Sequence, residues 1–130
     1  GDYADGIARH IIEDDCSYFN SAIINNLELE NMFDILIGMM TDSYVSLNAE
    51  SSQSFGKILI KDKGVNEIFH SSVLKIEEYL RQNIEEVRCG MKFLLVLRNM
   101  ERIGDHCKNI VEEIVFYIDA KVLKHKGKTE

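Results

Sequence analysis

The chain has 130 residues, contains no proline and carries a formal net charge of −7. This length suits a single domain with a hydrophobic core of its own. The acidic balance argues against nucleic acid as a partner, because nucleic-acid binding needs a basic surface, and no apolar run approaches the roughly 18 residues of a membrane span.

Four helical segments are expected in chain order. The first covers residues 2–12 and is followed by the acidic run Glu13-Asp14-Asp15. The second covers about 25–47 and the third about 52–81, and a serine-rich turn suited to capping separates them. The fourth covers about 85–120 and follows a short break.

Each of the longer segments carries apolar residues at steps of three and four, the spacing of a helix that is buried on one side. In the second segment, where Ser43 interrupts the pattern, they are Leu29, Phe33, Leu36, Met40 and Leu47. In the third they are Phe55, Ile58, Val65, Phe69, Val73, Ile76 and Leu80. In the fourth they are Phe93, Val96, Met100, Ile103, Cys107, Ile110 and Ile114. Because short connections make successive helices antiparallel neighbours, the sequence predicts an all-α fold: an antiparallel three-helix bundle with an extra N-terminal helix fragment.

The three cysteines, Cys16, Cys89 and Cys107, are odd in number and far apart in the chain. Such spacing indicates neither a disulfide framework nor a Cys-x-x-Cys metal site. We therefore expect a reducing compartment and a cytoplasmic location. Cys107 lies on the apolar line of the fourth helix and is expected to be a small buried side chain.

The fourth helix also carries an acidic motif. Glu101, Asp105, Asn109 and Glu112 share one helical face, which we expect to lie opposite the apolar line. Gly104 lies between the two faces, and glycine inside a helix costs about 1 kcal/mol relative to alanine. We therefore expect a neighbouring helix to approach closely at Gly104. Two carboxylates one turn apart can offer oxygen ligands to a cation.

Asp62 interrupts the apolar line of the third helix between Ile58 and Val65. A carboxylate in such a position is costly unless it is paired, hydrogen-bonded or bound to a metal. Two interpretations follow. Asp62 turns to the bundle edge or pairs with a lysine or Arg98, or it faces Glu101 and its neighbours across an antiparallel helix pair and shares a cation with them.

The sequence Glu101-Arg102-Ile103-Gly104-Asp105, followed by Asn109-Ile110 and Phe116-Tyr117, resembles the signature of the PhoU family. This family comprises bacterial regulators of phosphate uptake built from two tandem three-helix repeats. The run from Asp62 to Asn66 resembles the acidic motif of the preceding helix, with Asn66 in place of a second carboxylate. The start of the chain resembles the second half of the same signature. The resemblance therefore implies that residues 1–20 end the preceding repeat and that residues 21–130 form a PhoU-like bundle.

The resemblance also implies a function. It implies a metal ion (iron, zinc, manganese or magnesium) held by Glu101, Asp105, Asp62 and Asn66, and no catalytic residue or enzyme activity. It implies a negative regulator of phosphate uptake and phosphate-starvation signalling. The partners would be the ATPase subunit of the phosphate ABC transporter and a membrane sensor histidine kinase.

Two further expectations concern the ends of the chain. The apolar residues Ile7, Ile11 and Ile12 of the first helix favour a homodimer, because exposed apolar patches seek partners. The lysines of the C-terminal tail either complement the end of a helix and solubilise it, or contact a membrane surface peripherally. Two alternatives to the regulator remain: a metal-binding bundle without a signalling role, and a structural interaction domain whose acidic residues form surface ion pairs.

Overall fold

The computed structural model describes residues 1–12, 16 and 21–128. Its helices are α1 (Asp2–Ile12), α2 (Ser21–Asn26), α3 (Leu29–Ala49), α4 (Phe55–Gln82) and α5 (Val87–Lys126), with a short 3₁₀ turn at Ile84–Glu86 before α5. The described residues form no strand. The predicted all-α class is confirmed.

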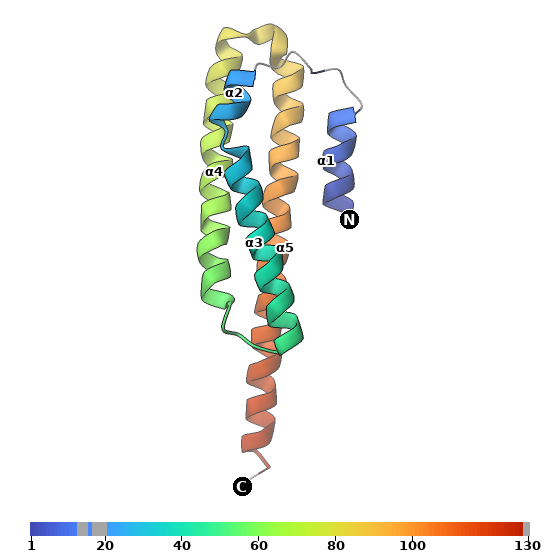
Figure 1. Cartoon of the computed structure of the whole chain (residues 1–130), viewed down its shortest axis with the longest axis vertical. Coiled ribbons are helices and arrows are strands. Elements are labelled where there is room, and N and C mark those ends of the chain that lie inside the picture. Colours follow the sequence, from blue (N-terminus) through green and yellow to red (C-terminus); the bar gives the residue numbers. More distant parts are fainter. Residues whose placement is uncertain (13–15, 17–20, 129–130) are drawn as a thin grey trace.

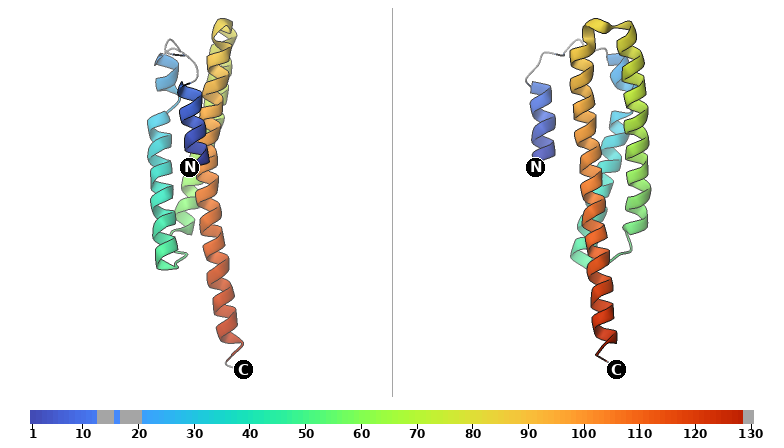
Figure 2. Two further views of the ribbon diagram at one scale, coloured as in Figure 1. Left: turned by 90° about the vertical axis from the view of Figure 1, so that its right-hand side faces the viewer. Right: turned by 180° about the vertical axis from the view of Figure 1, so that it is seen from behind.

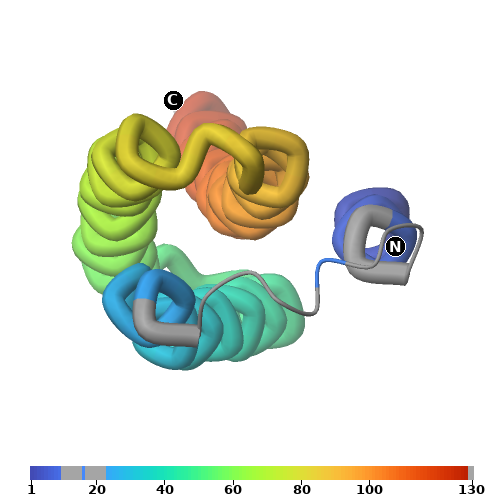
Figure 3. Tube along the Cα trace, turned by 90° about the horizontal axis from the view of Figure 1, so that it is seen from above, coloured from blue at the N-terminus to red at the C-terminus, as the bar shows by residue number. Residues whose placement is uncertain are grey.

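The three long helices form an antiparallel bundle, and the short α2 packs at one end of it (Figure 1). The first helix lies outside the bundle, beside α5 and antiparallel to it, in all views (Figures 2 and 3). At 40 residues α5 is the longest helix, and its C-terminal part extends beyond the ends of α3 and α4. Along the rest of its length, α5 contacts α1, α3 and α4.

The predicted second helix is interrupted. The chain leaves α2 after Asn26 and begins α3 at Leu29, and Glu28 between them has a left-handed backbone with φ 55°. Leu27 is fully buried, and its carbonyl accepts a hydrogen bond from Ser72 Oγ of α4 at 3.4 Å. Burying Leu27 fixes the turn, although a left-handed conformation costs a non-glycine residue roughly 1–2 kcal/mol. The expectation of one continuous helix here is wrong.

The buried line of α3 is also displaced from the predicted one. Phe33, Met40 and Leu47 are about half exposed. Leu36 is buried as predicted, and the other residues of α3 that face the core are Met32, Met39, Ser43 and Ser46. The sequence predicts an interruption at Ser43, yet Ser43 and Ser46 are both buried, and their small side chains let α3 pack closely against its neighbours. Ser43 Oγ lies 2.7 Å from the carbonyl of Met39 and 3.3 Å from that of Cys107, so burying this hydroxyl leaves it hydrogen-bonded.

The core of α4 and α5 follows the predicted lines more closely. Ile58, Val65 and Ile76 are completely buried in α4. In α5 the residues Val96, Met100, Cys107 and Ile114 are buried as predicted. Ile110, by contrast, is exposed, and Val111 takes its place in the core.

The close approach predicted at Gly104 is confirmed. A Cβ atom built at this residue would lie 3.4 Å from Leu36 Cδ2 and 3.6 Å from Met39 Sδ of α3. Gly104 is buried where α5 packs against α3, and this close contact explains a glycine in the middle of a long helix.

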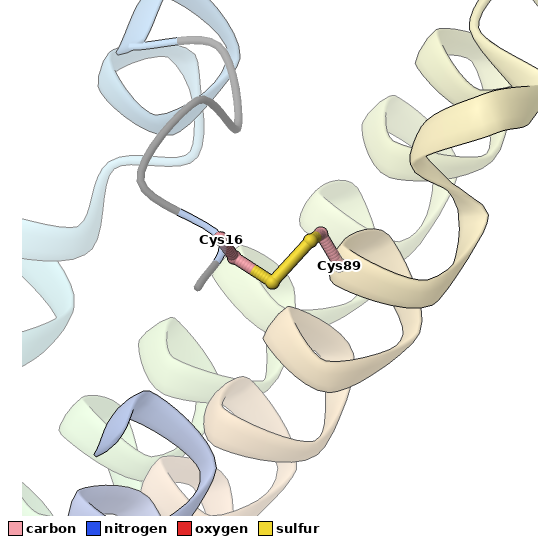
Figure 4. The surroundings of a disulfide bond; sticks show 2 residues. All are labelled: Cys16 and Cys89. Carbon is pink, nitrogen blue, oxygen red and sulfur yellow. A yellow bond between two sulfur atoms is a disulfide. The ribbon is translucent and has the colours of Figure 1, made fainter. Parts of the chain in front are cut away.

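A disulfide bond joins Cys16 to Cys89, and the expectation that these cysteines do not pair is wrong (Figure 4). Cys16 lies between α1 and α2, and Cys89 lies in the first turn of α5. Their separation of 73 residues gave no sign of contact, because only the antiparallel run of α4 along α3 brings the start of α5 back to the end of the bundle where Cys16 lies. Cys107 is free and buried, as predicted.

Candidate cation-binding face

The face shared by α4 and α5 carries the acidic residues singled out in the sequence. Lys108 Nζ lies 3.2 Å from Asp62 Oδ2, and the Arg98 guanidinium lies 5.6 Å from the centre of the Phe69 ring. These two contacts fix the antiparallel register of the helices. Asn66 lies between Asp62 and Phe69 on α4, so this register sets it opposite the segment 101–105 of α5.

Asp62 is buried, with 7 % of its surface exposed. Its Oδ2 accepts a hydrogen bond from Lys108, whereas its Oδ1 is buried without a hydrogen-bond partner. The interpretation that Asp62 pairs with a lysine is confirmed. The unpartnered oxygen is a cost to the fold, since a buried acceptor without a donor destabilises by roughly 1–3 kcal/mol.

Glu101 is also buried, so the expectation of an acidic face wholly opposite the core is wrong for this residue. The reason is that α5 is contacted by α1, α3 and α4, which leaves little of its circumference open to solvent. Arg98 Nη1 lies 2.9 Å from Glu101 Oε2. Burial raises the pKa of Glu101 above its ordinary value, the neighbouring Asp105 raises it further, and Arg98 and Arg102 act in the opposite direction.

Asp105 is less deeply placed, with a quarter of its side chain exposed. It lies 3.5 Å from Arg102 and 3.9 Å from Lys108. The pKa of Lys108 is raised, chiefly by its hydrogen bond to Asp62, against the effect of its own partial burial. The charges of Asp62, Asp105 and Glu112 add to this shift.

The carboxylates of this face are therefore interleaved with cations of the same chain. Asp62, Glu101 and Asp105 contact Lys108, Arg98 and Arg102. Within residues 1–12, 16 and 21–128, no three histidine, cysteine, aspartate or glutamate side chains converge in a way that could hold a metal ion. The structure thus joins Asp62 and Asp105 through Lys108, pairs Glu101 with Arg98, and leaves Asn66 half-buried on α4.

The donor chemistry of the face nevertheless suits a hard cation. Its candidate ligands are carboxylate and amide oxygens, which magnesium and manganese prefer. The unpartnered Oδ1 of Asp62 could accept a metal ion without losing a hydrogen bond. Sequence reasoning did not anticipate that Lys108 would contact these oxygens. The available signal was its position three residues after Asp105, on a neighbouring part of the same helical face.

The N-terminal half of α1 contacts α5 at His106. This residue is exposed beside the buried Cys107, and its Nε2 lies 3.2 Å from the Tyr3 hydroxyl of α1. A groove of about 660 Å³ lies next to this contact and is lined by α1, α3 and α5.

Ile7 packs half-buried against the core, while the side chains of Ile11 and Ile12 lie outside the described part of the structure. None of the helices described is long and apolar enough to cross a membrane.

An antiparallel bundle of three long helices, with one further helix packed outside it, defines a small all-α domain. The family model of the PhoU domain matches residues 29–114, which include α3, α4 and most of α5. The chain belongs to the PhoU domain family, and the resemblance seen in the sequence is confirmed.

Curated relatives carry the corresponding name. The "Phosphate-specific transport system accessory protein PhoU" of Escherichia coli K12 is 26% identical over 130 residues, which are all of this chain and 53% of the relative. That of Edwardsiella tarda is 25% identical over 127 residues, covering 98% of this chain and 51% of the relative. A homologue from Thermotoga maritima is 23% identical over 97 residues, covering 75% and 42%. The chain thus spans about half the length of the first two of these relatives, and no solved structure gives a significant match.

Proposed function

We propose that this chain serves as part of an accessory protein of a phosphate-specific transport system and acts as a negative regulator of phosphate uptake and of phosphate-starvation signalling. The observation that carries this proposal is the match of the PhoU domain to residues 29–114, together with the names of relatives that align over nearly the whole chain. The division into an end of one repeat (1–20) and a second bundle (21–130) belongs to the same proposal.

The mode of action we propose is binding, with no enzyme activity. In support, α3 exposes a line of large apolar side chains: Phe33, Ile37, Met40, Tyr44 and Leu47. Apolar surface in this quantity on one helix is typical of protein–protein contacts. The proposed partners are the ATPase subunit of the phosphate transporter and a membrane sensor histidine kinase, with the chain on the cytoplasmic side and at most peripherally associated with the membrane.

A binding experiment with the intact chain tests this proposal. The chain is immobilised and incubated with the purified ATPase subunit or with the cytoplasmic part of the histidine kinase, with and without inorganic phosphate. Retention of either partner supports the regulator. Retention of neither, with helix content intact, favours a metal-binding bundle without a signalling role.

The proposal extends to a divalent cation on the α4–α5 face. Asp62, Asn66, Glu101 and Asp105 would supply its oxygen donors, and the bound ion would present a charged surface to a partner. The unpartnered Oδ1 of Asp62 supports this assignment. Addition of manganese, magnesium, zinc or iron is expected to raise the melting temperature, since an ion that binds only the native state stabilises it. Asp105→Ala is expected to abolish the rise, and a melting temperature that ignores all four metals refutes the cation site.

We also propose that the chain forms a homodimer through α1 and the groove beside it. The apolar side chains that line the groove, among them Met40, Tyr44 and Ile110, support this contact. Light scattering at increasing protein concentration measures it. A strict monomer at the highest concentration excludes the dimer.

A further inference from the structure

The first helix is held to the rest of the chain by a shallow contact. Among the side chains of α1 that the structure describes, only Tyr3, Gly6 and Ile7 are not exposed, and none of the three is fully buried. The Tyr3 hydroxyl lies 3.2 Å from His106 Nε2 of α5. A Cβ atom built at Gly6 would lie 3.0 Å from Asn99 Nδ2 of the same helix. Since an isolated helix of 11 residues is only marginally stable in water, α1 depends on this contact for its conformation as well as for its position.

The Cys16–Cys89 disulfide adds a covalent link just after the end of α1 (Figure 4). Cys16 comes four residues after Ile12, the last residue of α1, and Cys89 is the third residue of α5. Four residues of chain reach at most about 14 Å, so the bond keeps the end of α1 within this distance of the start of α5. Without the bond, α1 is tethered through the nine residues that lead to Ser21, the first residue of α2, and these reach up to about 32 Å. The disulfide therefore shortens the tether of α1.

A shorter tether favours the docked position of α1. The local concentration of a tethered segment falls roughly as the −3/2 power of the tether length, so a change from four residues to nine lowers it about threefold. The equilibrium between docked and undocked α1 shifts by the same factor. A short helix that is held by three half-buried residues is sensitive to a change of this size.

The opposite end of α1 forms one wall of the groove described above. Tyr3 and Ala4 line this groove together with Met40 of α3 and Ile110 of α5. When α1 leaves α5, that wall is removed, and the apolar side chains of α3 and α5 in the groove face solvent. The state of the disulfide at one end of α1 is thus coupled to the shape of an apolar surface at its other end.

The two cysteines of the bond differ in their accessibility. Cys89 is 7% exposed, whereas Cys16 is only partly buried. The thiolate of a reduced glutathione molecule therefore attacks the sulfur of Cys16, forms a mixed disulfide with it and releases Cys89 as a thiol. A second glutathione thiolate attacks the glutathione sulfur of this mixed disulfide, which releases Cys16 as a thiol and forms oxidised glutathione. Two electrons and two protons pass from the two glutathione molecules to the two cysteines.

We propose that the Cys16–Cys89 bond is a redox latch: in the oxidised chain it holds α1 against α5, and in the reduced chain α1 undocks and the groove opens. On the cytoplasmic side, where the proposed function puts this chain, thiols are kept reduced, and the disulfides that form there are usually transient and redox-sensing. The latch rests on the proposed function for its compartment alone, because the coupling between the bond and α1 belongs to the chain itself.

Hydrogen–deuterium exchange of the full chain tests the latch. Three samples are compared: the oxidised protein, the protein reduced with dithiothreitol, and the variant Cys16→Ser. Labelling times are kept so short that the buried amides of α3, α4 and α5 exchange in none of them. The amides of α1 are expected to exchange about threefold faster in the reduced protein than in the oxidised one. Cys16→Ser should exchange like the reduced protein, and dithiothreitol should leave it unchanged.

A second measurement uses the wild-type chain alone. The chain is equilibrated with mixtures of reduced and oxidised glutathione, and the fraction of open Cys16–Cys89 bond is measured by alkylation and mass spectrometry. The exchange rate of α1 should follow this fraction across the mixtures.

Three results would overturn the latch. The first is equal exchange of α1 in the oxidised and reduced proteins. The second is an effect of dithiothreitol on Cys16→Ser, which would show that the reductant acts elsewhere in the chain. The third is a bond that glutathione opens only when the buried amides of the bundle also exchange, because reduction would then require unfolding. None of these results depends on the ATPase subunit or the histidine kinase, so the proposed function is tested separately by the binding experiment.

Discussion

Two glycines of α5 provide a sharp test of how closely the helices pack. Gly104 faces α3, where an added Cβ would lie 3.4 Å from Leu36 Cδ2, an ordinary van der Waals contact. Gly90 faces α4, where an added Cβ would lie 2.6, 2.8 and 3.0 Å from three carbon atoms of the Leu80 side chain. Both glycines are buried in the same helix, so Gly104→Ala and Gly90→Ala form a matched pair.

The expected energies follow from these distances. Gly104→Ala gains helix propensity, worth up to about 1 kcal/mol, at little packing cost. Gly90→Ala gains less, because it lies in the first turn of α5, and it forces Leu80 to move, for which overpacking costs typically about 1–3 kcal/mol. We therefore expect Gly104→Ala to be more stable than Gly90→Ala by about 1–3 kcal/mol.

Urea unfolding followed by far-UV circular dichroism measures both free energies of unfolding, with the slope m as a check on compactness. Equal slopes allow the midpoints to be compared directly. The reasoning fails if Gly90→Ala is the more stable variant, or if Gly104→Ala loses more than about 1 kcal/mol relative to wild type.

Three further predictions concern other parts of the fold. Reduction of the Cys16–Cys89 bond, which closes a loop of 73 residues, should lower the free energy of unfolding by about 4 kcal/mol. The variant Cys89→Ser should show the same loss. An unchanged urea midpoint after reduction would refute this prediction. The raised pKa of Glu101 means that its contribution to stability is present below its unfolded pKa and is lost as pH rises through the folded pKa. The free energy of unfolding of Glu101→Gln should therefore rise relative to that of wild type as the pH increases from about 4 to about 7. A fall in this free energy relative to wild type over the same range would contradict the raised pKa. Leu97→Ala, at a completely buried position, should cost about 2–5 kcal/mol, whereas Leu95→Ala, at a half-exposed one, should cost less than 1 kcal/mol by urea unfolding.

The helices of the bundle were predictable because their apolar spacing is a local property of the sequence. The buried residues of α4 and α5 follow this spacing well. In α3 it failed, because Phe33 and Met40 are apolar but exposed, while Ser43 is polar but buried. Small hydroxyl residues that bond to backbone carbonyls can face a tight helix contact, and hydrophobicity alone does not register this.

The candidate site was predictable only as a set of positions. The spacing of Glu101 and Asp105 put them on one part of α5, and the interrupted line of α4 singled out Asp62. The burial of Glu101 depends on how many helices contact α5, and the pairing of Asp62 depends on the register between α4 and α5. Both are properties of tertiary packing, as is the contact between Cys16 and Cys89.

The place of α5 after α3 and α4 in the sequence has a consequence for synthesis. This helix contacts α1, α3 and α4, so the core between them stays open until the 40 residues of α5 have been made. At about 5–20 residues per second, translation of α5 takes about 2–8 s. During this interval α3 and α4 stand as a two-helix hairpin whose apolar sides face solvent beside the ribosome. We expect chaperones to engage the nascent chain at this stage, and its release to coincide with the emergence of α5.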